Sequence, residues 1–184
     1  MKLFKSMFFV LALAFVPAKS FAGFALPISL TYISDSTKVS SVTATSTRLG
    51  ANISFGYILP AAPLYLGAMY DYEDLSGSNI TGKYTQTGYG LTVGMMTQNL
   101  YLLANYILSA QYDSKDTGST TVYKKGSGFL VRLGYGFDLG TITVGPEIAY
   151  RSIKYTERTS GSATTTVDIT LDSILPYFNA TFKF

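Results

Sequence analysis

The stretch GFLVRLGYGFDLGTITVGPEIAYR, residues 128–151, alternates apolar and polar side chains on both sides of a Leu-Gly pair. Alternation with a period of two is typical of a β-strand whose two faces meet different surroundings. A two-residue turn at Leu139-Gly140 predicts a hairpin in which the apolar residues of both strands share one face. On the other face, the same pairing sets Arg132 opposite Glu147. The stretch therefore predicts antiparallel strands with one apolar and one polar face.

The alternation recurs along most of the chain, and helical spacing is almost absent. It marks eight segments, at residues 24–35, 47–59, 64–75, 83–96, 100–113, 125–138, 141–157 and 165–184. Each is long enough for a tilted transmembrane strand of about 9 to 11 residues. Tight turns alternate with longer polar runs at residues 36–46, 76–82, 114–124 and 158–164, the layout of an outer-membrane barrel. The pattern predicts an all-β fold, an eight-stranded antiparallel up-and-down transmembrane β-barrel.

Two further turns predict strand pairs of the same kind. A turn over residues 60–63 sets Asn52 opposite Asp71, and a turn over residues 96–99 sets Gly90 opposite Asn105. In both hairpins the apolar residues again share one face. A slip of one residue would exchange the faces, so the pattern specifies which side chains point the same way.

The polar face carries many of the 17 glycines together with charged and amide side chains. A soluble, lipocalin-like barrel would turn this face to water and bury the apolar one. Glycine packs poorly on a water-facing strand, but it leaves room for long side chains inside a narrow barrel. We therefore expect the polar face to line the interior and the apolar face to contact lipid. The predicted interior network consists of Arg48, Asn52, Asp71, Glu73, Asn105, Arg132, Glu147 and Arg151.

The charged members of this network are compatible with two roles. Arg132 and Glu147, with Arg151, Asp71 and Glu73 nearby, would serve as a gate or an ion-conducting relay. Alternatively, they plug the barrel, because a buried charge is tolerated only when it is paired and the interior of eight strands is just filled by side chains. The narrow interior favours the plug, since its polar groups must be satisfied whatever the protein does.

Residues 1–22 have the features of a secretory signal peptide. Lys2 and Lys5 precede an apolar run at residues 7–16, and Ala22 is a small residue of the kind that signal peptidase requires. The run is too short to cross a bilayer as a helix, and the barrel is expected over residues 23–184. Removing the three lysines of this leader from the 14 basic residues leaves 11, equal to the 11 acidic ones. The mature chain is thus close to neutral, and we expect no nucleic-acid partner.

The sequence contains no His and no Cys. The usual general base, the commonest metal ligand and the thiol nucleophile are therefore missing, and no Ser-Lys or carboxylate constellation replaces them. We expect no enzymatic activity, no catalytic residue, no metal and no cofactor.

The chain ends in PYFNATFKF, residues 176–184, with Phe178, Ala180, Phe182 and Phe184 on one face of an extended strand. With this strand, residues 23–184 resemble the small eight-stranded outer-membrane barrels, the group that includes the OmpA transmembrane domain, OmpX and OmpW. The resemblance implies a Gram-negative bacterial outer membrane with both termini periplasmic. It also implies that the four residues form an assembly signal read by the barrel-assembly machinery. More weakly, the chain resembles porin-like barrels of predatory bacteria that associate around lipid.

These features predict a non-enzymatic protein with a structural or interaction role, in contact with outer-membrane lipid. The alternative is a porin-like protein that passes small solutes or ions, or a homo-oligomer that encloses lipid between barrels. Small residues on the apolar face, Ala51, Ala68, Ala104 and Ala110, would permit close approach between subunits. Ordinary strand composition accounts for these alanines equally well.

Pro176 lies at a change of phase in the last segment. Leu171 and Leu175 have the opposite parity from Phe178 and Phe182. We therefore predict a β-bulge or the membrane edge at Pro176.

Overall fold

The computed structural model describes residues 22–39, 42–60, 62–77, 82–116 and 119–184, and the predicted leader up to residue 21 lies outside them. The strands are β1 Gly23–Val39, β2 Val42–Ile58, β3 Leu64–Gly77, β4 Gly82–Met96, β5 Leu100–Asp116, β6 Ser119–Tyr135, β7 Phe137–Asp138, β8 Ile142–Ser160 and β9 Ala163–Lys183. The all-β prediction is confirmed, and each predicted segment overlaps one long strand, with β7 at the end of the segment 125–138. Within the described ranges, no helix has the length and apolar character needed to cross a membrane.

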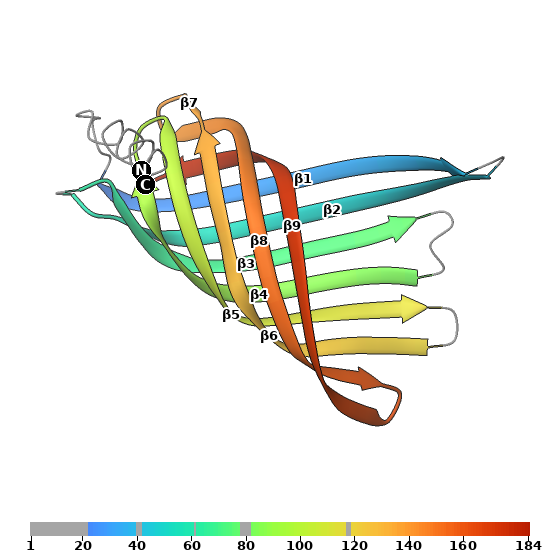
Figure 1. Cartoon of the computed structure of the whole chain (residues 1–184). Helices are drawn as coiled ribbons and strands as arrows, with labels where there is room; N and C mark the ends of the chain where they lie inside the picture. Colours follow the sequence, from blue (N-terminus) through green and yellow to red (C-terminus); the bar gives the residue numbers. More distant parts are fainter. Residues whose placement is uncertain (1–21, 40–41, 61, 78–81, 117–118) are drawn as a thin grey trace, which may run out of the picture.

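The strands form one antiparallel sheet that closes into a ring (Figure 1). Strands β1 to β6 pair in sequence order, β6 pairs with β8, β8 with β9, and β9 with β1. The two-residue strand β7 follows β6 and also pairs with β8. The last strand pairs with the first, since Leu26 faces Phe182 and the Phe184 N–H donates to the Phe24 carbonyl over 2.9 Å.

The strands run further than predicted at the end of the ring where the β1–β2 hairpin lies. We call this the tip end, and the opposite end, with the turns near residues 60, 98 and 140, the turn end. Parts of the four predicted polar runs are strand, and the β8–β9 hairpin turns within residues 161–162. The prediction of long loops at the tip end is therefore wrong. Thr and Val favour extended backbone, and none of these runs contains a proline to interrupt a ladder.

The three predicted hairpins have different outcomes. The β2–β3 register is confirmed, with Asn52 opposite Asp71. The other two registers are wrong by two residues: Glu147 lies opposite Gly134 instead of Arg132, and Gly90 lies opposite Ile107 instead of Asn105.

Both errors come from turns that are centred one residue later than predicted. The Leu139 N–H donates to the Ile142 carbonyl over 2.8 Å, so the two turn residues are Gly140 and Thr141. Gly140 has a φ of 93°, which fits the glycine-first type of two-residue hairpin. Likewise, the Thr97 N–H donates to the Leu100 carbonyl over 2.9 Å, which places the turn at residues 98–99.

The faces of the sheet follow the predicted parity. Polar and charged side chains such as Asn52, Asp71 and Arg132 are fully buried inside the ring. Large apolar side chains are exposed on the outward face, with Tyr106 59% and Phe178 58% exposed. The lipocalin-like arrangement, with the apolar face inward, is therefore wrong for this chain.

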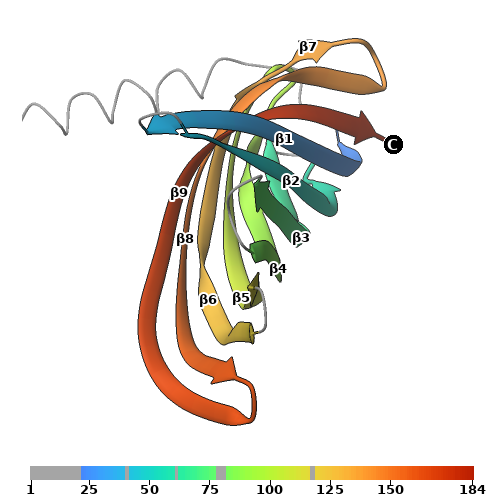
Figure 2. The ribbon, with the colours of Figure 1, turned by 90° about the vertical axis from the view of Figure 1, so that its right-hand side faces the viewer.

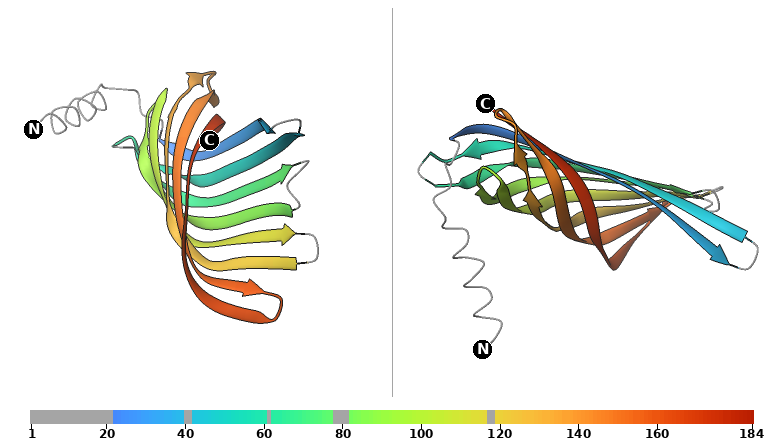
Figure 3. Two further views of the ribbon diagram at one scale, coloured as in Figure 1. Left: turned by 45° about the vertical axis from the view of Figure 1, so that its right-hand side comes forward. Right: turned by 90° about the horizontal axis from the view of Figure 1, so that it is seen from above.

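The ring is closed over only part of the length of its strands. Pairing between β1 and β9 covers six residue pairs and ends at Leu30 opposite Phe178. Beyond this pair, towards the tip end, the β1–β2 and β8–β9 hairpins point in different directions (Figures 1, 2 and 3). The tip-end half of β9 therefore pairs with β8 on one side, and on the other side it has a free edge, with no strand partner among the described residues.

The predicted bulge at Pro176 is absent. Pairing between β8 and β9 runs without a shift from Ile142 to Tyr155, with Pro176 opposite Ile148. Leu175 and Tyr177 are both buried, so the inward phase continues through the proline. The free edge explains why proline is tolerated, because the missing N–H would face the side from which β1 has departed.

Candidate functional site inside the ring

The centre of the interior is occupied by Arg132 of β6 and Glu147 of β8. Arg132 Nη1 lies 3.8 Å from Glu147 Oε2, and both side chains are fully buried. The Ser29 hydroxyl connects them, since it accepts from Arg132 Nη1 over 3.1 Å and donates to Glu147 Oε2 over 3.0 Å. Tyr101 donates to the same carboxylate oxygen over 2.8 Å. Arg132 and Glu147 thus form a serine-bridged pair between the adjacent strands β6 and β8.

A second charged group lies nearer the tip end. Arg151 of β8 donates through Nη1 to Asp71 Oδ2 over 3.0 Å and through Nη2 to Glu73 Oε2 over 2.5 Å. Arg48 of β2 approaches the other oxygen of Glu73 with its Nε at 3.5 Å. Two guanidinium groups therefore balance two carboxylates, which lowers the cost of burying each charge.

Ser54 and Asn52 of β2 join the two groups. Arg132 Nη2 donates to Ser54 Oγ over 2.8 Å, and Ser54 donates to Asn52 Oδ1 over 3.4 Å. Asn52 Nδ2 then donates to Asp71 Oδ1 over 3.2 Å. One network of hydrogen bonds and ion pairs thus runs along the interior from Glu147 to Arg48.

The structure brings together all but one of the predicted network residues. Asn105 is buried but belongs to a separate pair, where it accepts from Thr92 over 2.6 Å and donates to the Leu130 carbonyl. Arg48 is the least buried member, with 31% of its side chain exposed. Arg132 and Glu147 do interact, but as diagonal neighbours on the adjacent strands β6 and β8 and not as directly opposed residues.

Sequence reasoning missed the uncharged members of the network, Ser29, Ser54, Tyr101 and Asn179. Asn179 donates to Ser29 over 2.9 Å, so this serine is contacted by three side chains of the network. The alternation along each strand would have identified them, because it shows which residues point inward. A mid-strand serine or asparagine of that parity is expected to be buried and therefore to need a hydrogen-bond partner.

The interior also contains two apolar clusters that were not predicted. One consists of Met69, Ile107, Ala110, Leu130, Ala149, Ile153, Tyr155, Leu175 and Tyr177, and the other of Ala25, Ile58, Tyr65, Met96, Tyr101 and Leu103. Ala110 was expected on the outward face and lies inside instead. Register shifts in β5 between Ile107 and Tyr112 change which residues point inward.

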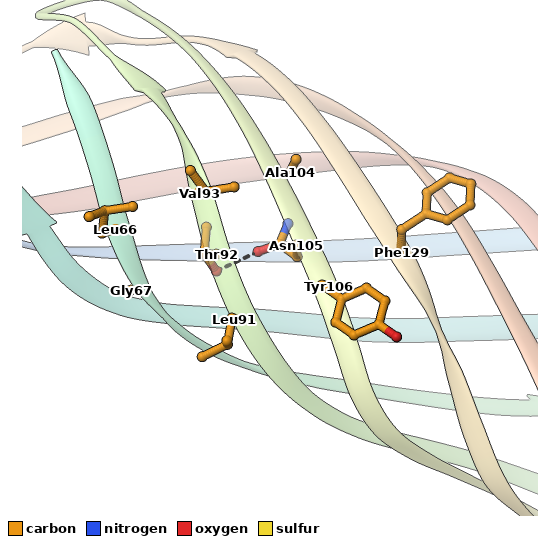
Figure 4. Close-up of a pocket in the computed structure, with 9 residues that line it drawn as sticks. All are labelled: Leu66, Gly67, Leu91, Thr92, Val93, Ala104, Asn105, Tyr106 and Phe129. Carbon is orange, nitrogen blue, oxygen red and sulfur yellow. Dashed lines mark hydrogen bonds between the residues drawn. The ribbon is translucent and has the colours of Figure 1, made fainter.

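The outward face has a shallow hollow of about 500 Å³ over β3 to β6, shown in Figure 4. Leu66, Leu91, Val93, Tyr106 and Phe129 frame it, and the small residues Gly67 and Ala104 also line it. The hydrogen bond between Thr92 and Asn105 lies behind the hollow, on the inner side of the wall (Figure 4). The lining is almost entirely apolar.

At the turn end, Asp138 connects three parts of the chain. It accepts from Gln98 over 2.5 Å and from Lys183 over 3.3 Å, which links the β4–β5 turn and the last strand to β7. The hydrogen bond from Gln98, followed by that from Lys183, holds the pKa of Asp138 below its usual value. The predicted assembly residues lie on the outward face of the same last strand, where Phe178 and Phe184 are exposed.

The interior of the ring offers paired charges and hydrogen-bond donors. In the part of the chain that the structure describes, no group of three His, Cys, Asp or Glu residues is placed to hold a metal ion. Each carboxylate of the network already has a guanidinium partner. No protein-family model matches the chain, and no curated protein matches it in sequence.

Proposed function

We propose that this chain is an eight-stranded transmembrane β-barrel of a Gram-negative outer membrane, non-enzymatic, with a structural or interaction role and a lumen plugged by polar side chains. The observation that carries the proposal is the inverted distribution of side chains. Buried positions hold Arg132, Glu147 and Arg151, whereas the outward face exposes large aliphatic and aromatic residues. Lipid, and not water, is the solvent that such an exterior requires.

Strand length supports the same proposal. The long strands have 14 to 21 residues. A tilted strand needs about 9 to 11 residues to cross the hydrocarbon core, so each is long enough to cross and to project beyond it. Closure of the ring between β1 and β9 leaves no unpaired edge along the paired segment, as a lipid environment demands.

The plugged lumen is supported by the network and by the apolar clusters on either side of it. Tyr65, Tyr101 and Arg132 are among the buried side chains that occupy the interior. Opening a water path would require moving the Arg132–Glu147 pair, whose carboxylate is held by Ser29 and Tyr101. The structural role is therefore favoured over conduction.

The membrane proposal can be tested with single tryptophans, because the sequence has none. Tyr106→Trp places the probe on the outward face of β5, and Lys115→Trp places it at the exposed tip end of the same strand. In vesicles that contain lipids brominated along the acyl chain, we expect strong fluorescence quenching of the first probe and little of the second. Quenching of the Tyr106→Trp probe by aqueous iodide but not by brominated lipid would refute the membrane location.

The plug can be tested separately by planar-bilayer recording. We expect no steady conductance from the unmodified chain. Steady conductance that changes in Arg132→Ala or Glu147→Ala would establish the porin-like alternative and refute the proposal that the lumen is closed.

A further inference from the structure

A cavity of about 160 Å³ lies beside the Arg151–Glu73 ion pair on the tip side. Residues of β2, β3, β4, β5, β8 and β9 line it, so that it is enclosed between opposite walls of the ring. We call it the tip cavity. One water takes up about 30 Å³ of liquid volume, so the cavity has room for about five waters or one small solute.

The tip cavity is lined by hydrogen-bond donors that lack an acceptor. Gln86 of β4 is only 4% exposed, and its Nε2 has no hydrogen-bond partner among the described residues. The hydroxyl oxygen of Ser173 in β9 is also buried and has no hydrogen-bond partner among the described residues. Buried polar groups are nearly always paired in folded proteins, so two unpaired groups around one cavity indicate a missing partner.

The two carboxylates around the cavity, by contrast, each have a partner among the described residues. The two oxygens of Glu73 face Arg151 and Arg48. Asp172 also lines the cavity, but its carboxylate is turned towards the Tyr150 hydroxyl on the outward side, at 3.4 Å. The tip cavity therefore has more unpaired hydrogen-bond donors than acceptors. A molecule that binds there should be rich in hydrogen-bond acceptors.

Arg48 adds a positive charge that a ligand can reach. Within the described ranges its ion pair to Glu73 is formed through Nε. A planar guanidinium can present further N–H groups to a second oxygen ligand. Arg48 also lines an adjoining hollow of about 220 Å³ with Ile33, Ser46 and Leu75, which gives the guanidinium a path to solvent.

We propose that the tip cavity binds a small oxyanion, a carboxylate or phosphate group, held by Arg48, Gln86 and Ser173. The rings of Tyr84 and Tyr112, stacked with centroids 5.9 Å apart, form the apolar wall that limits its size. This site goes beyond the proposed structural role, and it does not depend on whether the lumen conducts.

The test is a titration of the full-length, ¹⁵N-labelled chain followed by NMR, in maltoside micelles that carry no phosphate. Inorganic phosphate and acetate are added in parallel, with sodium chloride at matched ionic strength as the reference. We expect saturable shifts of the Gln86 side-chain amide with at least one of the two oxyanions and none with chloride. Equal shifts with chloride, or no saturation with either oxyanion, would overturn the site.

Two variants and a matched control locate the binding. Arg48→Gln and Gln86→Leu should each weaken the binding at least about tenfold, because each removes a donor to the anion. Arg158→Gln removes an exposed arginine of β8 that does not line the cavity, and it should bind like the unmodified chain. Unchanged spectra away from the cavity establish that the variants are folded. Similar loss in Arg158→Gln would show a general charge effect and refute the assignment.

A competition experiment distinguishes a lipid phosphate from a free solute as the source of the oxyanion. Displacement of bound phosphate by lipopolysaccharide assigns the site to a lipid phosphate, whereas retention assigns it to a free solute. Failure of every titration would leave the brominated-lipid result unaffected, so the oxyanion site and the membrane location can be rejected independently.

Discussion

Ser29 of β1 bridges Arg132 and Glu147, whose closest nitrogen and oxygen atoms lie 3.8 Å apart. The two charged residues come from β6 and β8, and the serine comes from the strand that closes the ring. The serine bridge therefore depends on closure between β1 and β9, because only closure brings Ser29 to the two charged residues, which lie on neighbouring strands. Closure of the ring thus completes the hydrogen bonding of the charged pair.

Replacing Arg132 with methionine should lower the free energy of unfolding by about 3–5 kcal/mol, since Glu147 would be left buried without its counter-charge. Urea unfolding in detergent micelles measures the change. Arg158→Met is the control, because this exposed arginine should contribute less than about 0.5 kcal/mol. The double variant Arg132→Met/Glu147→Leu should recover part of the loss. A double variant as unstable as the sum of its singles would show that the two charges are not coupled.

Gly134 should not tolerate even one added methyl group. A Cβ there would lie 2.1 Å from the ring of Tyr101, which donates to Glu147. We expect Gly134→Ala to displace this ring and to destabilise the protein by about 1–3 kcal/mol. Gly88→Ala is the matched control, because the nearest atom to its Cβ would be 3.5 Å away. Equal urea midpoints for the two variants would contradict the close contact.

The free edge of β9 should be visible in amide hydrogen exchange. The Lys183 N–H bonds to Thr141 on the β8 side and the Phe184 N–H to Phe24 on the β1 side, so even-numbered amides of β9 face β1. Beyond Pro176, where β1 has departed, the amides of Asp172 and Ile174 should exchange fast. The amides of Ser173 and Leu175, which face β8, should exchange slowly. Uniform protection across residues 172–175 would mean that the edge is covered.

Asp138 should make stability depend on pH. Its pKa in the folded chain is depressed, chiefly by the hydrogen bond from Gln98. Its stabilisation is therefore fully present above the ordinary aspartate pKa and is lost as the pH falls through the depressed value. Comparison of urea midpoints at pH 7 and pH 3 should show a smaller difference in Asp138→Asn than in the unmodified chain. The control is Asp168→Asn, which alters an exposed pair with Lys154. A pH difference reduced equally in both variants would argue against a specific role for Asp138.

Much of the network could be predicted from parity, because inward and outward residues alternate along every strand. Arg132, Glu147, Arg151 and Asp71 were placed inside on this basis and are buried. The hydrogen-bond partners of these residues could not be predicted from the alternation. Arg132 contacts Ser29 and Ser54, which lie 103 and 78 residues away in the chain, and no local pattern encodes such distances.

The alternating sequence by itself determined the strands, the two faces and which face is polar. The tertiary structure alone decided the register of β4–β5 and β6–β8, the inward turn of Ala110 and the point near Phe178 where β1 and β9 part. The physical reason lies in the period of the pattern. A shift of two residues leaves every side chain on its face, so alternation cannot detect it, and only the turn geometry and the packing around the closed ring select one register.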